Sequence, residues 1–442
     1  VSSSDKVNDY ILKNLSYIGS TKNSKVINLE SILPGPNLVN INNPDEIEYF
    51  ITNGFTVVIR NNTIVAIETK ADINRSVSTP DTEPAVNGPK DAFTENYQIN
   101  MGLVKRRIKS NTLKTDEFTI GRKTKTKIGV LYFDDIAETE LVDSIKKKIE
   151  TIDIDGIIDS STVGQLIADE AKVHFPTYVT TERPDNVSRA LLEGKIVIMV
   201  DTSPLAIILP AFFIDFINPG MDQYNKSKNV NFIKIVRFLC FFLSMIIPSI
   251  YIAVVNYNQE TIPTNLLVSF SIQHDGVPFP AIIEAFIMLF ICEMLRESDL
   301  RFPNSYGSAI SILGALVLGD AAVSAGIVSP IMIITISLTF MASLMFTETE
   351  LSSALRFLRF IFIILASFYG ILGIVFGVLF FLIKINDLYS FGKPYFFPLM
   401  PFDKIYALKS VLKAETRKDT KRTSMLTDKN YTKQGENLWK KS

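Results

Sequence analysis

The chain has 442 residues, 47% of them hydrophobic, and a formal net charge of -1 at pH 7. This length and apolar content exclude a single small soluble domain. The balanced charge conceals a segregation, since the basic residues within 238–383 are confined to Arg296, Arg301, Arg356 and Arg359. From residue 384 onward, 13 Lys and Arg stand against 6 Asp and Glu. A basic segment after an apolar region indicates a cytoplasmic flank of a membrane domain.

Motifs of catalysis are missing from the sequence. It contains no Walker A, GxGxxG, GxSxG or HExxH pattern, and its two histidines lie far apart. Cys240 and Cys292 fall in apolar stretches, which predicts small buried side chains and neither a disulfide nor a metal site. We therefore expect no enzyme, no cofactor and no metal. The first residues lack the pattern of a secretory signal, so the N-terminal half is expected in the cytoplasm.

Residues from about 25 to 220 are typical of a mixed α/β region, which we divide into subdomains 1–90 and 91–225. Two β-rich runs, 56–60 and 63–67, flank Asn61-Asn62 and predict a β-hairpin. A Pro- and Gly-containing linker follows at 79–89. Periodicity then predicts a helix over 92–108, a strand over 127–133, helices over 138–152 and 160–171, a strand over 178–181, a helix from 184 and a strand over 195–200. The alternation favours a sheet with helices packed on it.

A membrane domain is expected over 226–385, followed by a basic cytoplasmic tail over 386–442. The uncharged stretch 238–255 would measure about 27 Å as a helix, close to the thickness of a bilayer core. The uncharged stretch 361–383 predicts a second span. Three less regular apolar segments lie between them, at 282–295, 308–328 and 331–346. The shorter apolar run 207–217 is expected to be core or interfacial rather than a span.

The positions of basic residues predict a topology for these segments. Basic residues flanking the apolar region place both of its ends inside, whereas 256–275 has no Lys or Arg and is expected outside. Both ends inside require an even number of crossings, yet five segments are present. We expect one segment within 308–346 to enter without crossing. This choice leaves Arg356 and Arg359 outside, against the charge rule.

Two acidic residues fall at membrane depth, where an ionised group costs about 2.5–3.5 kcal/mol. Glu284 and Glu293 are nine residues apart and so lie on opposite sides of a helix. Two interpretations remain open. One pairs Glu293 with Arg296 and Glu297 with Arg301 along the helix. The other gives Glu284 a role in an ion pathway.

The segment 308–328 is rich in small residues. One stripe contains Ser311, Ala315, Leu318 and Ala322, and a second contains Gly307, Gly314 and Ala321. Small stripes allow helices to pack closely, as would Gly373 and Gly377 in the last apolar stretch. Alternatively, copies of this helix surround an axis, so that the first stripe lines a narrow pore and Asp320 concentrates cations at its mouth. We expect the basic clusters to face solvent or lipid headgroups, not nucleic acid.

The order of several motifs resembles the A subunits of GerA-type spore germinant receptors. The resemblance covers nearly the whole chain. It includes Gly88-Pro89, Phe93-Thr94-Glu95, Arg106-Arg107, Asn218-Pro219, Pro248-Ser249-Ile250-Tyr251-Ile252-Ala253, Gly276-Val277-Pro278-Phe279-Pro280, Glu284-Ala285, Glu293-Met294-Leu295-Arg296-Glu297, Arg301-Phe302-Pro303, Gly314-Ala315-Leu316-Val317-Leu318-Gly319 and Val328-Ser329-Pro330. Thr347-Glu348-Thr349 departs from the pattern, because it replaces a Pro-Asn turn before the last helices.

The resemblance implies a multi-pass protein of the inner spore membrane with a cytoplasmic α/β region. It implies that the chain forms a complex with a transporter-like B subunit, which recognises the nutrient, and with a lipoprotein C subunit. It also implies a homo-oligomer, a pentamer in the family picture, that conducts monovalent cations. We therefore expect a subunit of a germinant-gated channel. The alternative is a non-conducting scaffold that organises the receptor cluster.

Overall fold

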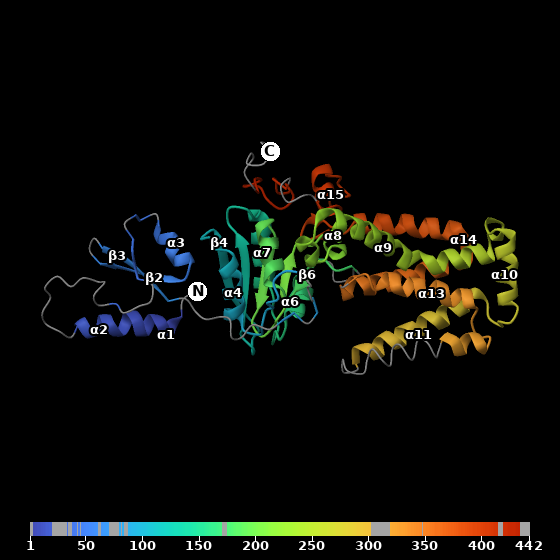
Figure 1. Ribbon diagram of the computed structural model, residues 1–442, viewed down its shortest axis with the longest axis horizontal. Coiled ribbons are helices and arrows are strands. Elements are labelled where there is room, and N and C mark those ends of the chain that lie inside the picture. The colour runs from blue at the N-terminus through green and yellow to red at the C-terminus, as the bar shows by residue number, and fades with distance from the viewer. Residues whose placement is uncertain are drawn as a thin grey trace.

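The computed structural model has three parts arranged along its long axis: a small N-terminal sheet, a larger central sheet and a helical bundle (Figure 1). The structure describes residues 3–19, 33, 38–41, 43–44, 46–60, 63–69, 79–80, 82–83, 87–169, 175–301, 319–346, 348–413 and 419–433. Statements below concern these residues. An α/β region followed by a helical region is the fold class that the sequence predicts.

The N-terminal sheet contains the predicted hairpin. The elements are α1 (Ser4–Val7), a π-helical turn (Asn8–Leu12), α2 (Lys13–Gly19), β1 (Val39–Asn40), α3 (Glu46–Thr52), β2 (Phe55–Arg60) and β3 (Thr63–Glu68). The strand order is β1-β3-β2. In the antiparallel hairpin Val58 pairs with Val65 and Ile59 with Ile64. The β-hairpin prediction is therefore confirmed.

The central sheet has five antiparallel strands in the order β4-β5-β7-β8-β6. Its elements are α4 (Tyr97–Arg107), β4 (Leu113–Ile120), β5 (Thr126–Phe133), α5 (Thr139–Glu150), α6 (Ser160–Ile167), β6 (Val179–Thr181), α7 (Pro184–Leu192), β7 (Ile196–Val200) and β8 (Ala206–Leu209). Side chains of β7 alternate between the two faces: Val197 and Met199 pack with α4 and α7, and Ile196 and Ile198 pack with α5 and α6. The predicted helices and strands are present here, but the helix predicted over 92–108 begins at Tyr97 and the one predicted over 160–171 ends at Ile167. The strands β4 and β8 were not predicted.

The predicted core segment 207–217 is buried, as expected, and divides between β8 and α8 (Phe213–Ile217). A 3₁₀ turn (Gly220–Tyr224) leads into the bundle of α9 (Ser227–Asn256), α10 (Thr264–His274), α11 (Ala281–Arg301), α13 (Pro330–Ser343) and α14 (Thr349–Asn386). A second 3₁₀ turn, Gln259–Thr261, separates α9 from α10. We call the end of the bundle beside the central sheet proximal, and the opposite end, where α10 lies, distal (Figure 1).

The last apolar stretch is a hairpin, so the prediction of one continuous span over 361–383 is wrong. Gly370 has a φ of 59° and a ψ of -139° and breaks α14 into two limbs, 349–369 and 371–386. The turn lies at the distal end, where the Tyr257 hydroxyl donates to the Ser367 carbonyl over 2.5 Å. Phe381 and Ile385 of the second limb share a proximal cluster with Leu351 of the first limb. Both limbs therefore have their outer ends beside the central sheet.

The hairpin changes the side of the bundle on which the basic residues of α14 lie relative to the C-terminal segment. Because the chain turns at Gly370, Arg356 lies on the same side of the bundle as the C-terminal segment. That segment contains β9 (Tyr389–Ser390), β10 (Lys393–Pro394) and α15 (Lys404–Ser410) and packs back on the central part (Figure 1). Tyr395 and Leu426 are fully buried.

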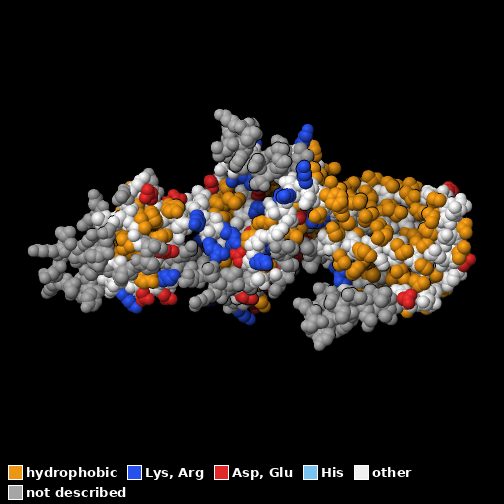
Figure 2. All heavy atoms as spheres, viewed as in Figure 1, with side chains coloured by type: hydrophobic (Ala, Val, Ile, Leu, Met, Phe, Trp, Pro, Cys, Tyr) orange, Lys and Arg blue, Asp and Glu red, His pale blue; other side chains and the backbone are white. Residues whose placement is uncertain are grey.

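On the face of the molecule in Figure 2, apolar side chains cover most of the helical bundle, whereas charged side chains gather on the sheets. Large exposed hydrophobic side chains on α14 alone include Phe357, Phe368, Leu372, Phe376 and Phe380. By length and composition α9 is long and apolar enough to cross a membrane, and so is the stretch Glu350–Asn386, which the turn at Gly370 divides into two limbs. The surface and the helices together indicate a bundle embedded in lipid.

Candidate functional site

A polar network lies inside the distal half of the apolar bundle. Glu284 on α11 is fully buried, and its Oε2 accepts a hydrogen bond of 2.7 Å from the backbone N–H of Ser329. Its Oε1 lies 3.3 Å from His274 Nδ1. His274 Nε2 in turn lies 2.7 Å from the Tyr251 hydroxyl. Buried polar groups in an apolar bundle are costly unless they are paired, so this network fixes the arrangement of the helices around it.

The network joins four parts of the bundle. Tyr251 comes from α9, His274 from the end of α10, Glu284 from the first turn of α11, and Ser329 is the N-cap of α13. The Ser329 side chain accepts from the Met332 N–H, while its own N–H reaches Glu284. A change in the charge of His274 or Glu284 would act on all four elements at once. This is the property required of a switch between two arrangements.

A second charged group lies in the proximal half. Glu293 accepts from Arg356 over 2.7 Å and lies 3.6 Å from Arg296, so the predicted pair along the helix is present. The side chain of Arg301, partner of Glu297 in the second predicted pair, lies outside the described residues. Arg359 is 3% exposed and donates to the Ser244 carbonyl over 2.7 Å. Arg296 and Arg356 thus share the Glu293 carboxylate and tie α11 to α14, while Arg359 ties α14 to α9.

The described residues include only part of the predicted pore stripe. Ser311, Ala315 and Leu318 lie outside them, as do Gly307 and Gly314 of the second stripe. Asp320 and Ala321 are exposed at the distal end, and Ala322 packs against the cluster that contains Tyr251 and Ile252.

Gly373 and Gly377 lie inside the hairpin. A Cβ on Gly373 would be 2.1 Å from the Leu365 carbonyl oxygen, and one on Gly377 would be 2.7 Å from the Phe362 ring. The two glycines therefore let the limbs of α14 approach each other closely.

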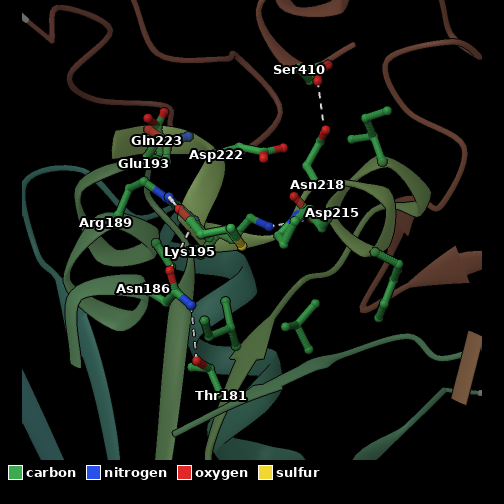
Figure 3. Close-up of a pocket in the computed structure, with 18 of the residues that line it drawn as sticks. Thr181, Asn186, Arg189, Glu193, Lys195, Asp215, Asn218, Asp222, Gln223 and Ser410 are labelled. Carbon is green, nitrogen blue, oxygen red and sulfur yellow. Dashed lines mark hydrogen bonds and ion pairs between the residues drawn. The ribbon is translucent and has the colours of Figure 1, made fainter. Parts of the chain in front are cut away.

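A cavity of about 440 Å³ lies at the junction of the central sheet, the proximal end of α9 and the C-terminal segment. Figure 3 shows Arg189, Asp222 and Asn218 around it, with Asn218 reaching the Ser410 carbonyl at 2.8 Å. Several charged groups of its wall are paired. The pairs that line it are Lys195 with Asp215 at 2.6 Å, Lys409 with Asp419 at 2.7 Å, and Lys433 with Glu193.

Two carboxyl groups at another part of this wall come from the linker and from the start of α14. Burial, with the charges of Glu83 and Glu350, raises the pKa of Glu348 to about 7. Burial also raises the pKa of Glu83, although the Thr181 hydroxyl donates to it over 2.7 Å. Glu348 is the residue at which the sequence departs from the family pattern. The departure therefore places an ionisable group where the first limb of α14 meets the central sheet.

Replacing Glu348 with glutamine is expected to stabilise the protein above pH 7. The folded state raises the pKa of Glu348, so its contribution to stability is full below about pH 4.5 and is lost as pH rises through about 7. The variant should exceed the unmodified protein by about 1–2 kcal/mol at pH 8 and match it at pH 5. Thermal unfolding in detergent at both pH values measures this. Asp387→Asn removes an exposed carboxylate at the end of α14 and serves as the control; an equal effect from both variants would contradict the prediction.

Sequence reasoning missed several members of these sites. No motif marks His274, although its place just before an apolar segment with an acidic residue is a usable signal. Glu83 carries no such signal because its partner Thr181 is 98 residues away, and Arg189 carries none because the Gly220 carbonyl that it reaches lies on another element. In the sequence Lys234 is only one of the basic residues that flank the first predicted span.

Comparison with known proteins identifies the family. The family model described as "Bacillus/Clostridium GerA spore germination protein" matches residues 1–425. Spore germination protein KA of Bacillus subtilis is 39% identical over 367 residues, which are 83% of this chain and 68% of that protein. The uncharacterized membrane protein YfkQ of the same organism is 40% identical over 76% of this chain and 65% of its own length. The chain thus spans about two thirds of these relatives.

Other relatives agree. Spore germination protein A1 of Bacillus subtilis is 34% identical over 84% of this chain and 73% of its own length. Among solved structures, the N-terminal domain of the A subunit of the Bacillus megaterium spore germinant receptor GerK3 is 31% identical, covers 48% of this chain and 79% of that chain, and has a TM-score of 0.36. From the family match across residues 1–425, the chain belongs to the GerA family of spore germination proteins.

Proposed function

We propose that this chain is the A subunit of a nutrient receptor that triggers spore germination, and that its copies assemble into a germinant-gated cation channel. Membership of the GerA family supports the receptor role. The proposed receptor complex contains a transporter-like B subunit and a lipoprotein C subunit beside this chain. The proposed location is the inner spore membrane, with the sheets and the C-terminal segment in the cytoplasm.

The observation that supports a channel is an exposed surface of small side chains at the distal end of the bundle, with the Asp320 carboxylate at its edge. Asp320, Ala321, Ser324 and Ala325 are exposed, and an added Cβ on Gly319 would meet no atom within 4 Å. A surface of small side chains is suited to close contact with another copy. A ring of Asp320 carboxylates around a shared axis would raise the local concentration of cations.

The arrangement of Glu284 supports gating. Its network links α9, α10, α11 and the start of α13, which is the helix that follows the exposed small-residue surface. Ligand binding on a partner subunit would open the channel by favouring one of two arrangements of these helices. The Gly370 hairpin supports a topology with both flanks of the bundle on the cytoplasmic side, because the outer end of its second limb lies beside the central sheet.

Ion flux through vesicles that contain the full chain tests the channel. Reconstituted oligomers should release potassium, and Asp320→Asn should lower the flux by about two- to threefold because it removes charge at the mouth. Asp275→Asn removes another exposed distal carboxylate and should leave the flux unchanged. Tight vesicles with intact oligomers would instead favour the scaffold role. Equal effects from the two variants would contradict the placement of Asp320 at the mouth.

A further inference from the structure

Three basic side chains from three parts of the chain lie at or behind the wall of the junction cavity, and none of them has an ion pair among the described residues. Arg189 of α7 reaches only the Gly220 carbonyl and the Asn186 side chain, both at 3.5 Å. Lys234 of α9 is 8% exposed, and its Nζ donates to the Ser410 carbonyl at 3.1 Å. Both side chains line the cavity.

Lys413 of the C-terminal segment lies beside these two. Its Nζ donates to three backbone carbonyls, those of Asp222 at 3.1 Å, Gln223 at 2.7 Å and Asn225 at 2.7 Å. Burial lowers the pKa of Lys413, and the nearby charge of Arg189 lowers it further, against the opposite effect of Asp222. The three positive charges are therefore close enough to repel one another electrostatically.

The carboxylate that acts on both lysines is already engaged. Asp222 and Arg237 form an ion pair of 2.9 Å in which both side chains are 8% exposed. Arg189, Lys234 and Lys413 consequently leave an excess of positive charge in a largely desolvated corner. Neutral carbonyl acceptors compensate such charge poorly, and an anion held by several N–H donors compensates it well.

The corner lies at the level of the lipid headgroups. Lys234 precedes by four residues the point where the uncharged stretch of α9 begins at Phe238. On the same turns of α9, Phe232 is 70% exposed and Ile235 is 59% exposed, so apolar side chains face outward beside the cavity. The cavity volume of about 440 Å³ is ample for a phosphate group with its ester substituents.

We propose that Arg189, Lys234 and Lys413 form a binding site for a phosphate group, supplied either by an anionic lipid headgroup or by a free phosphate. Phosphate oxygens accept several charge-assisted hydrogen bonds at once, which suits the Arg189 guanidinium and the Lys234 ammonium group. The three N–H groups of Lys413 already donate to backbone carbonyls, so Lys413 contributes its positive charge and not a hydrogen bond. The bound group joins the central sheet, the first membrane helix and the C-terminal segment. It therefore locks the junction between the sheets and the bundle.

Thermal unfolding of the full chain in detergent, at constant ionic strength, tests this site. Separate samples receive inorganic phosphate, short-chain phosphatidylglycerol, or the diacylglycerol of the same chain length, which lacks the phosphate. We expect the melting temperature to rise by several degrees with at least one phosphate-bearing probe and not with diacylglycerol. Arg189→Gln and Lys234→Gln should each weaken the apparent affinity about tenfold. Lys228→Gln, an exposed lysine of α9, is the matched control and should keep the full response.

The pattern of responses also identifies the source. A rise with phosphatidylglycerol alone assigns the site to a lipid headgroup, and a rise with inorganic phosphate alone assigns it to a free phosphate. Either result supports the proposal if the response is lost in Arg189→Gln, which leaves the buried lysine in place. No rise with either probe, an equal rise with diacylglycerol, or equal responses from Arg189→Gln and Lys228→Gln would overturn it.

Discussion

Glu284→Ala is expected to loosen the distal half of the bundle and to lower its stability by about 2–4 kcal/mol. The substitution removes the acceptor of the Ser329 N–H and leaves His274 facing an empty space. It also opens a cavity at a position that is fully buried. Because Ser329 caps α13, the first turn of that helix should lose protection against hydrogen exchange.

Glu284→Gln separates the role of charge from that of hydrogen bonding. The amide oxygen of Gln still accepts from Ser329, so most of the stability should return, while the negative charge that faces His274 is removed. Melting temperature in detergent and hydrogen exchange of residues 322–332 measure both effects. If the alanine and glutamine variants lost equal stability, the Ser329 hydrogen bond would not be what holds α13.

The same pair of variants bears on gating. If the contact between Glu284 and His274 favours one arrangement of the helices, Glu284→Gln should change germination of spores that carry it even though the folded protein remains. Glu293→Gln, on the same helix but paired with Arg356, disturbs a different interaction and is the comparison.

Gly370→Val is expected to destroy the hairpin of α14. The φ of 59° with a ψ of -139° is a conformation that residues with a Cβ avoid, and the cost is about 1–3 kcal/mol. The added Cβ would also lie 3.0 Å from the Tyr257 Cβ. A chain that stays helical through this point extends into one long helix and moves the C-terminal segment away from the central sheet.

Cysteine labelling in sealed vesicles measures on which side of the membrane each end of α14 lies. In a background without the native cysteines, Glu350→Cys and Asp387→Cys should react with an impermeant maleimide from the same side as Lys90→Cys. Addition of Gly370→Val should change the accessibility of position 387. Gly392→Ala is the control, since Gly392 also has a positive φ but lies outside the hairpin with open space around it. This variant should leave the accessibility of position 387 unchanged. Labelling of positions 350 and 387 from opposite sides in the unmodified chain would rule out the hairpin.

The local elements were accessible from sequence because each depends on neighbouring residues. The runs on either side of Asn61-Asn62 predicted β2 and β3, and the spacing of Leu141, Ile145 and Ile149 predicted the buried face of α5. Helix geometry predicts that Glu284 and Glu293 lie on opposite sides of α11. In the structure Glu284 is fully buried and Glu293 lies beside Arg296. The sequence of β4 did not predict a strand, because its apolar and polar residues do not alternate regularly.

Sequence by itself determined the division into sheets and an apolar helical bundle, because burial of apolar side chains sets the local period of hydrophobicity. It did not determine where the last apolar stretch turns. An uncharged run with several glycines satisfies a straight helix and a hairpin equally well, and only the contacts of Gly370 with Tyr257 and of Gly373 with Leu365 select the hairpin. Only the tertiary structure reveals the junction cavity. Arg189, Lys234 and Lys413 are far apart in the chain, and side chains brought together by folding give no periodic pattern in the sequence.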